Sequence, residues 1–145
     1  MNTRSVALSL MERIFAEGFS TGNADVVDAV CSPDLVEHQF RPTSGEAPSA
    51  IEQVKDAIRS LHRAVPDISF TIEDSVEQGD KIWVRVRAQG TASGPFFGPP
   101  SNRRLDLTVI DVARVVDGRI VEHWGVPDRF AMLVQTGVLE RLAQA

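Results

Sequence analysis

The chain has 145 residues, of which 43% are hydrophobic and 24% are charged, a composition typical of a globular domain with a substantial core. A formal net charge of −5 argues against a nucleic-acid partner, because phosphate binding needs a concentrated basic surface. No run approaches the roughly 18–20 apolar residues that span a bilayer, and the N-terminus lacks the apolar centre of a signal peptide. We therefore expect one domain over residues 1–145, in the cytoplasm, with no membrane or nucleic acid as partner.

The chain contains a single cysteine, Cys31, so an intrachain disulfide cannot form and a reducing compartment is favoured. We expect Cys31 to be a small apolar residue of a short helix; a reactive thiol is the alternative.

The first segments of the chain have helical periodicity. Apolar residues recur at three- and four-residue spacing over Val6–Phe15, which predicts an amphipathic helix that ends near Gly18. A second, short helix is predicted through Val26–Val30, and it ends at Ser32-Pro33 because a residue before proline is disfavoured in a helix.

A short strand is predicted over Asp34–Phe40, followed by a turn-rich loop, Arg41–Pro48. One face of this strand carries Val36, His38 and Phe40. Ser49 and Glu52 have the spacing of a capping box, which opens a third helix that Pro66 closes.

From residue 67 onward the period changes from helical to alternating. Strands are predicted around Ile68–Val76 and Lys81–Gly90, followed by a Gly/Pro-rich loop at Gly94–Ser101. Asp117-Gly118 between two alternating runs predicts a tight hairpin, and Phe130–Leu142 can form a final helix. Helices first and antiparallel strands afterwards predict an α+β fold, with helices on one face of a strongly curved, cone-shaped sheet.

A few polar residues share strand faces with apolar ones. Asp111 is in phase with an otherwise apolar face, and His38 lies between two apolar neighbours. In the last strand Glu122 and Trp124 share a side, and Asp128 joins them if the extended phase persists. A carboxyl group in apolar surroundings has a raised pKa, which suits it to general acid/base catalysis near neutral pH.

Each of these residues also has a structural interpretation. Asp128 precedes a predicted helix and could be its N-cap, a role that does not exclude catalysis. His38 could be a hydrogen-bonded core or rim residue, and Asp111 could pair with Arg87 or Arg114.

Motifs for cofactors and metals are missing from the sequence. It has no P-loop, no dinucleotide-binding glycine motif and no zinc-ligand spacing, so we expect neither a metal site nor a cofactor. Phe96 and Phe97 lie in the Gly/Pro-rich loop and form either a hydrophobic plug or a lid over an apolar ligand.

The order of elements, the loop FFGPP and above all DGRIVEHWGVPDRFAMLVQTGVL resemble the SnoaL-like polyketide cyclases, a family of the nuclear transport factor 2-like superfamily. The resemblance covers roughly Val6 to Leu139. The sequence departs from the family pattern at ASGPFFGPPSNR. The histidine that the family has in this loop is missing here, near Ala92 or Ser93.

The resemblance implies a cofactor-free intramolecular aldol condensation that closes a ring in a small, apolar, polyketide-like substrate. By position, Asp128 corresponds to the catalytic acid/base of the family, and His38 matches a histidine common after the second helix. His38 is therefore expected to be catalytic as well, orienting or polarising a carbonyl group together with Asp111. The residues expected to bind the substrate are Asp111, Glu122, Trp124, Phe96 and Phe97.

Two other functions remain open from the sequence. The same fold could bind a small apolar ligand without chemistry, or catalyse a different acid/base reaction, isomerisation or epoxide hydrolysis. Curved sheets of this type commonly pair through their exposed face, so a homodimer or a higher homo-oligomer is expected.

Overall fold

The computed structural model describes residues 4–40, 45 and 47–145. In chain order its elements are α1 (Val6–Arg13), the π-helix η1 (Ile14–Phe19), α2 (Val26–Val30), β1 (Cys31–Glu37), α3 (Ala50–Ala64), β2 (Ser69–Gln78), β3 (Lys81–Thr91), β4 (Arg104–Val116), β5 (Arg119–Pro127), α4 (Arg129–Gln135) and α5 (Val138–Ala143). The strands form one sheet in the order β1-β5-β4-β3-β2, in which β1 is parallel to β5 and all other pairs are antiparallel.

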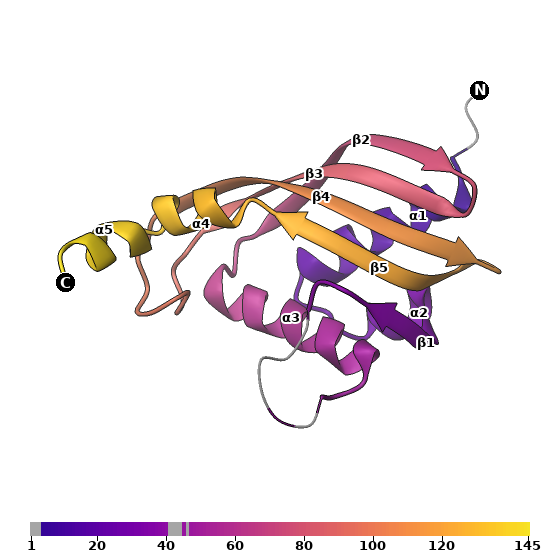
Figure 1. The fold of residues 1–145 in the computed structure, drawn as a ribbon, viewed down its shortest axis with the longest axis horizontal. Coiled ribbons are helices and arrows are strands. Elements are labelled where there is room, and N and C mark those ends of the chain that lie inside the picture. Colours follow the sequence, from indigo (N-terminus) through magenta and orange to yellow (C-terminus); the bar gives the residue numbers. More distant parts are fainter. Residues whose placement is uncertain (1–3, 41–44, 46) are drawn as a thin grey trace.

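The helices of the first half cover one face of this sheet, and the other face is left open (Figure 1). The sheet curves over α1, α2 and α3, while α4 and α5 extend beyond the end of β5. This arrangement confirms the predicted α+β class, a curved and mostly antiparallel sheet roofed by helices.

The helix starts follow from local capping. The Ser5 hydroxyl accepts a hydrogen bond from the Leu8 amide at 3.0 Å, and the Ser49 hydroxyl accepts one from the Glu52 amide at 3.2 Å. Each satisfies one of the amides that a helix leaves without an internal partner. None of the helices in the described ranges is long and apolar enough to cross a membrane.

One-residue β-bulges in the antiparallel part of the sheet change the direction of side chains. In the β4–β5 pair Arg114 lies opposite Glu122 but Val115 lies opposite Ile120, so Val121 is an extra residue. A similar shift occurs in β2, between Ile72 and Asp74. Because side chains alternate along a strand, one extra residue moves every later side chain to the opposite face.

The predicted hairpin is present. Asp117 and Gly118 have φ angles of 51° and 72°, the positive values that a type I′ turn requires. Two other expectations are corrected: Cys31 begins a strand and does not belong to a helix, and the strand expected over Asp34–Phe40 runs over Cys31–Glu37. The loop predicted at 41–48 lies largely outside the described residues.

Candidate active site

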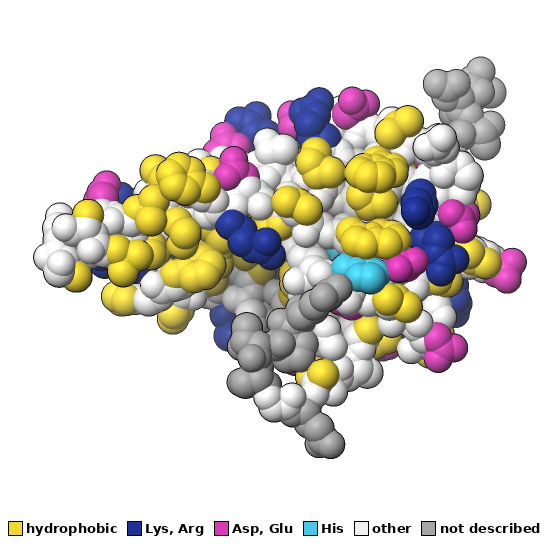
Figure 2. Space-filling view, in the orientation of Figure 1, with side chains coloured by type: hydrophobic (Ala, Val, Ile, Leu, Met, Phe, Trp, Pro, Cys, Tyr) yellow, Lys and Arg dark blue, Asp and Glu magenta, His cyan; other side chains and the backbone are white. Residues whose placement is uncertain are grey.

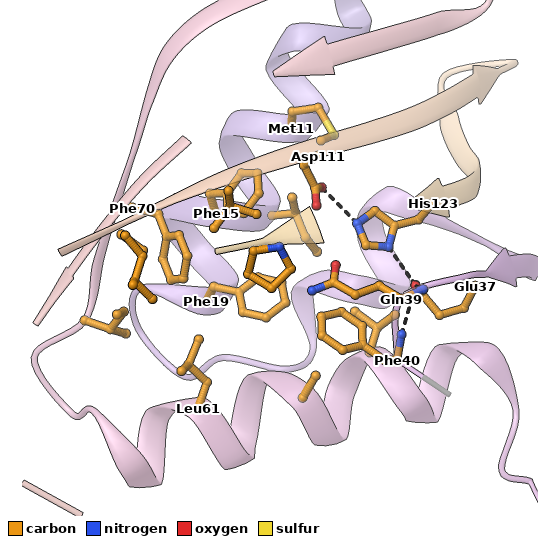
Figure 3. Close-up of a pocket in the computed structure, with 18 of the residues that line it drawn as sticks. Met11, Phe15, Phe19, Glu37, Gln39, Phe40, Leu61, Phe70, Asp111 and His123 are labelled. Atoms are coloured by element: carbon orange, nitrogen blue, oxygen red, sulfur yellow. Dashed lines mark hydrogen bonds and ion pairs between the residues drawn. The ribbon is translucent and has the colours of Figure 1, made fainter. Parts of the chain in front are cut away.

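A cavity of about 270 Å³ lies between the helices and the inner face of the sheet. Its walls are almost entirely apolar, and four phenylalanine rings form one side: Phe15 and Phe19 of η1, Phe40 after β1 and Phe70 of β2 (Figure 3). The rings contact one another with centroid distances of 5.4–6.1 Å. This lining suits a small ligand with an aromatic or alicyclic body.

The polar groups of the cavity form one hydrogen-bonded row, Glu37–His123–Asp111. The Nδ1 atom of His123 lies 2.8 Å from both carboxylate oxygens of Glu37, and Nε2 lies 2.8 Å from Oδ2 of Asp111. Glu37 and His123 are neighbours in the parallel β1–β5 pair, and Asp111 projects from β4 beside them. All three side chains are buried or nearly so.

The row has perturbed acid/base properties. Burial lowers the pKa of His123, but the carboxylates of Asp111 and Glu37 more than reverse this and bring it to about 10. Burial raises the pKa of Asp111 above its ordinary value, and the positive charge of His123 offsets only part of that rise. At neutral pH His123 is therefore an imidazolium, and Asp111 is a stronger base than an exposed aspartate.

One carboxylate oxygen of Asp111 is available to a ligand. His123 contacts Oδ2, whereas Oδ1 has no hydrogen-bond partner within the described residues. This oxygen lies over the backbone of Gly125, where a Cβ atom would come within 2.5 Å of it. The carboxamide oxygen of Gln39 lies over the same glycine, and in the part of the chain that the structure describes no hydrogen bond occupies that carboxamide. Gly125 thus makes room for two polar groups at one end of an apolar cavity.

Cys31 also lines the cavity, as a free thiol. Burial and the negative charges of Glu37 and Asp28 raise its pKa to about 12. A thiol in that state is not a nucleophile at neutral pH, which excludes the reactive-thiol alternative. Among the described residues, no group of His, Cys, Asp and Glu side chains is arranged to hold a metal ion.

The rim of the cavity contains the two phenylalanines that the sequence singled out. Phe96 and Phe97 both line it, and their rings are 4.7 Å apart. Phe97 is 56% exposed, and its carbonyl oxygen accepts a hydrogen bond from Arg141 of α5 at 2.9 Å. Arg129 and Met132 of α4 complete this end of the lining.

Asp128 does not lie in the cavity. Its side chain is exposed, and it caps α4 by accepting a hydrogen bond from the amide of Ala131 at 2.9 Å. The capping interpretation of this residue is therefore confirmed, whereas the expectation that it faces the pocket is corrected.

The other three predicted residues of the last strand and its neighbour lie on the opposite, outer face of the sheet. The rings of His38 and Trp124 stack with centroids 4.8 Å apart, and Nε2 of His38 lies 2.7 Å from Oε2 of Glu122. Glu122 also accepts a hydrogen bond from Arg114 at 3.1 Å. None of these three, His38, Glu122 and Trp124, lines the cavity.

The bulge at Val121 explains this exchange of faces. Strict alternation from the buried Ile120 would direct Glu122 and Trp124 inward; the extra residue instead turns His123 and Gly125 inward. Asp111 precedes the register shift that β4 shows at Arg114 and Val115, so it faces the cavity as the alternation predicts.

Sequence reasoning missed the polar residues at the inner end of the cavity other than Asp111, namely Glu37, Gln39 and His123. Polar residues occupy both faces of β1 and β5, so the alternation alone does not show which of them point into the cavity. The register of the parallel β1–β5 pair was needed to bring Glu37 beside His123.

Comparison with known proteins gives the chain a family. Among solved structures it is similar to TsrD from Streptomyces laurentii, with 30% identity, a TM-score of 0.80 and coverage of 94% of this chain and 98% of that one. It is also similar to IdmH, a candidate polyketide cyclase from Streptomyces antibioticus, with 29% identity, a TM-score of 0.76 and coverage of 89% and 96%. An LEH-like epoxide hydrolase from M. tuberculosis shares the fold, with 18% identity, a TM-score of 0.65 and coverage of 97% of both chains.

A search of curated proteins gave no match. The profile of the SnoaL-like polyketide cyclases, in contrast, matches residues 9–136 of the 145. The chain therefore belongs to the SnoaL-like polyketide cyclase family.

Proposed function

We propose that this protein is an acid/base enzyme that closes a ring in a small apolar substrate by intramolecular aldol condensation, with Asp111 as the base. The observation that carries this proposal is the unoccupied oxygen of Asp111, which borders an apolar cavity while His123 holds the other oxygen. Its raised pKa supports the role, because a stronger base accepts a proton from carbon more readily.

The proposed reaction is redox-neutral and needs one proton shuttle. Asp111 removes a proton from the carbon beside a carbonyl group, and the resulting enolate carbon attacks a second carbonyl carbon of the same molecule. The C–C bond that forms leaves an alkoxide, which takes the proton back from Asp111. Holding both reacting carbons in one small cavity supplies much of the rate enhancement.

The neighbours of Asp111 have supporting roles in this proposal. The imidazolium of His123 fixes the orientation of the carboxylate, and Glu37 in turn fixes the ring. The Gln39 carboxamide reaches the same end of the cavity and supplies an N–H donor for the enolate oxygen. The chain has no tyrosine, so a phenol cannot be that donor.

The size of the cavity limits the substrate. An apolar cavity of roughly 150 Å³ holds one benzene molecule. The 270 Å³ found here is less than twice that volume. We therefore propose a substrate with one or two rings, or a chain that folds to that size.

Proton abstraction can be tested without the natural substrate. The two-ring ketone 2-tetralone has acidic C–H groups beside its carbonyl, and their exchange for deuterium in D₂O is followed by proton NMR. We expect the protein to accelerate this exchange and Asp111→Asn to reduce the acceleration by roughly 100-fold or more, the contribution typical of a general base. Asparagine keeps an acceptor for His123, so the fold should survive the change.

Asp128→Asn is the matched control. It makes the same substitution at the aspartate that caps α4, and asparagine is also a good N-cap, so exchange should continue at the wild-type rate. If Asp128→Asn loses the exchange activity and Asp111→Asn keeps it in full, the base is Asp128 and not Asp111. A protein that binds 2-tetralone without accelerating exchange would be a binding module, not an enzyme.

We further propose that the protein is a cytoplasmic homodimer. The open face of the sheet exposes large apolar side chains on neighbouring strands, namely Val76, Trp83, Ile110 and Val126. Figure 2 shows hydrophobic side chains gathered there, beside a histidine. Monomers rarely expose a contiguous patch of this kind, and a two-fold axis would bury it against its own copy.

A further inference from the structure

Arg129 is a cation at the rim of the cavity, and it has no ion-pair partner among the residues that the structure describes. It is the first residue of α4, its side chain is exposed, and it belongs to the lining. Its neighbour Asp128 caps α4 by accepting a hydrogen bond from the amide of Ala131, and the described residues show no ion pair between Asp128 and Arg129. No ion pair or hydrogen bond engages the Arg129 guanidinium in the ranges that the structure describes.

The other arginines of the described ranges differ from Arg129 in this respect. Each has a carboxylate, hydroxyl or carbonyl partner: Arg4, Arg13, Arg59, Arg63, Arg85, Arg87, Arg103, Arg104, Arg114, Arg119 and Arg141. Among the arginines that the structure describes, the guanidinium without a protein partner is thus the one that borders the cavity.

The two ends of the cavity have opposite electrostatic character. The inner end holds the carboxylates of Glu37 and Asp111 around a single imidazolium, which disfavours a second anion there. The rim holds a guanidinium, whose planar donor array matches a carboxylate. An amphiphilic acid would therefore bind with its apolar body inside and its carboxylate at Arg129.

The strand register gives the separation of these two ends. Asp111 lies two residues from Val109 along β4, and Val109 pairs with Pro127. That offset is about 7 Å at the usual rise per residue, and Arg129 follows two residues after Pro127. A body of two fused rings that carries a carboxylate has the length to reach from one end to the other.

We propose that Arg129 forms a carboxylate-binding subsite, so that the substrate of this protein is a small ring-containing or ring-forming acid and not a neutral ester. This inference rests on the proposed function, because it takes the cavity as the substrate site. It adds the charge and the orientation of the substrate: the acid group binds at the rim, and the reacting carbon lies at Asp111.

The test compares two probes of the same size and different charge, 2-naphthoate and the neutral 2-naphthylmethanol, by isothermal titration calorimetry at pH 7. Wild-type protein should bind 2-naphthoate about tenfold or more tightly than the alcohol. Arg129→Met should remove that preference: the affinity for 2-naphthoate should fall about tenfold, while the affinity for the alcohol changes less than twofold. Added salt should weaken the binding of 2-naphthoate but not that of the alcohol, because salt screens charge interactions at an exposed subsite.

Arg104→Met is the matched control. Arg104 has the same charge, pairs with Asp67 on the surface and does not line the cavity, so its loss should leave both affinities unchanged. Equal binding of the two probes by wild type, or a preference for the acid that survives in Arg129→Met, would overturn the subsite and leave the proposed acid/base function intact. If neither probe binds to wild type, the inference and the proposed use of the cavity both fail.

Discussion

At the scale of single residues, His123 links the chemistry of the cavity to the stability of the protein. Its two ring nitrogens contact Asp111 and Glu37, and these carboxylates hold the pKa at about 10 against an ordinary value of 6.5. A group whose pKa is raised by folding binds more protons in the folded state than in the unfolded state. Its contribution to the free energy of unfolding is complete below pH 6.5 and is lost as the pH rises through 10.

We therefore expect the free energy of unfolding to fall by a few kcal/mol between pH 6.5 and 10. Burial also raises the pKa of Asp111, so its titration lowers the free energy of unfolding as the pH rises above its ordinary value of 3.8. Urea unfolding of wild type and His123→Gln across this range measures the effect. The variant should be less stable at pH 6.5 and should show a flatter profile; parallel profiles would contradict the charge assigned to His123.

At the scale of the elements, strand β5 is built so that a polar group of β4 and one of the segment after β1 can meet over it. Gly125 has no side chain, and the Gln39 carboxamide and Oδ1 of Asp111 occupy the space where a Cβ atom would lie. Gly125→Ala should displace the flexible Gln39 side chain at a cost of about 1 kcal/mol in the free energy of unfolding, in the range of mild overpacking.

The activity of Gly125→Ala should fall much more than its stability. Displacing Gln39 removes the proposed enolate donor, and crowding at Asp111 disturbs the base, so exchange of 2-tetralone should slow by at least about tenfold. Deuterium exchange and urea unfolding of the same preparation separate the two effects. Wild-type exchange in a folded variant would mean that neither group acts at this position.

At the scale of the whole molecule, the sheet presents two faces with different uses. The inner face lines the cavity, and the outer face carries exposed apolar residues together with the stacked pair His38 and Trp124 (Figure 2). Trp83 is 48% exposed on that outer face, where it and Trp124 flank Val112 and line the same shallow hollow. This asymmetry supports assembly through the sheet and leaves the cavity rim accessible.

Trp83→Glu should convert the proposed homodimer to a monomer, because it places a charge in the surface that pairing would desolvate. Light scattering during gel filtration measures the mass directly. Leu142→Glu is the matched control: Leu142 is 66% exposed on α5, away from the sheet face, and its replacement should leave the mass unchanged. A wild-type protein that runs as a monomer would refute the assembly.

The sequence alone determined the fold class and much of the local structure. Capping at Ser49, the hairpin turn at Asp117-Gly118 and the N-cap at Asp128 are local patterns, so neighbouring residues suffice to define them. The family resemblance was equally accessible, since it rests on a motif that stretches over the last strand and helix.

Only the tertiary structure decided which side chains reach the cavity. The inward direction of Asp111 could be inferred from the sequence because β4 alternates without interruption through that position. The sequence could not predict which residues of β5 point inward, because the one-residue bulge at Val121 exchanges the two faces of the strand and leaves no local signal. This applies to Glu122, His123 and Trp124. Glu37 and Gln39 depend in turn on the register of a parallel strand pair whose members lie more than eighty residues apart, a contact that only the assembled sheet creates.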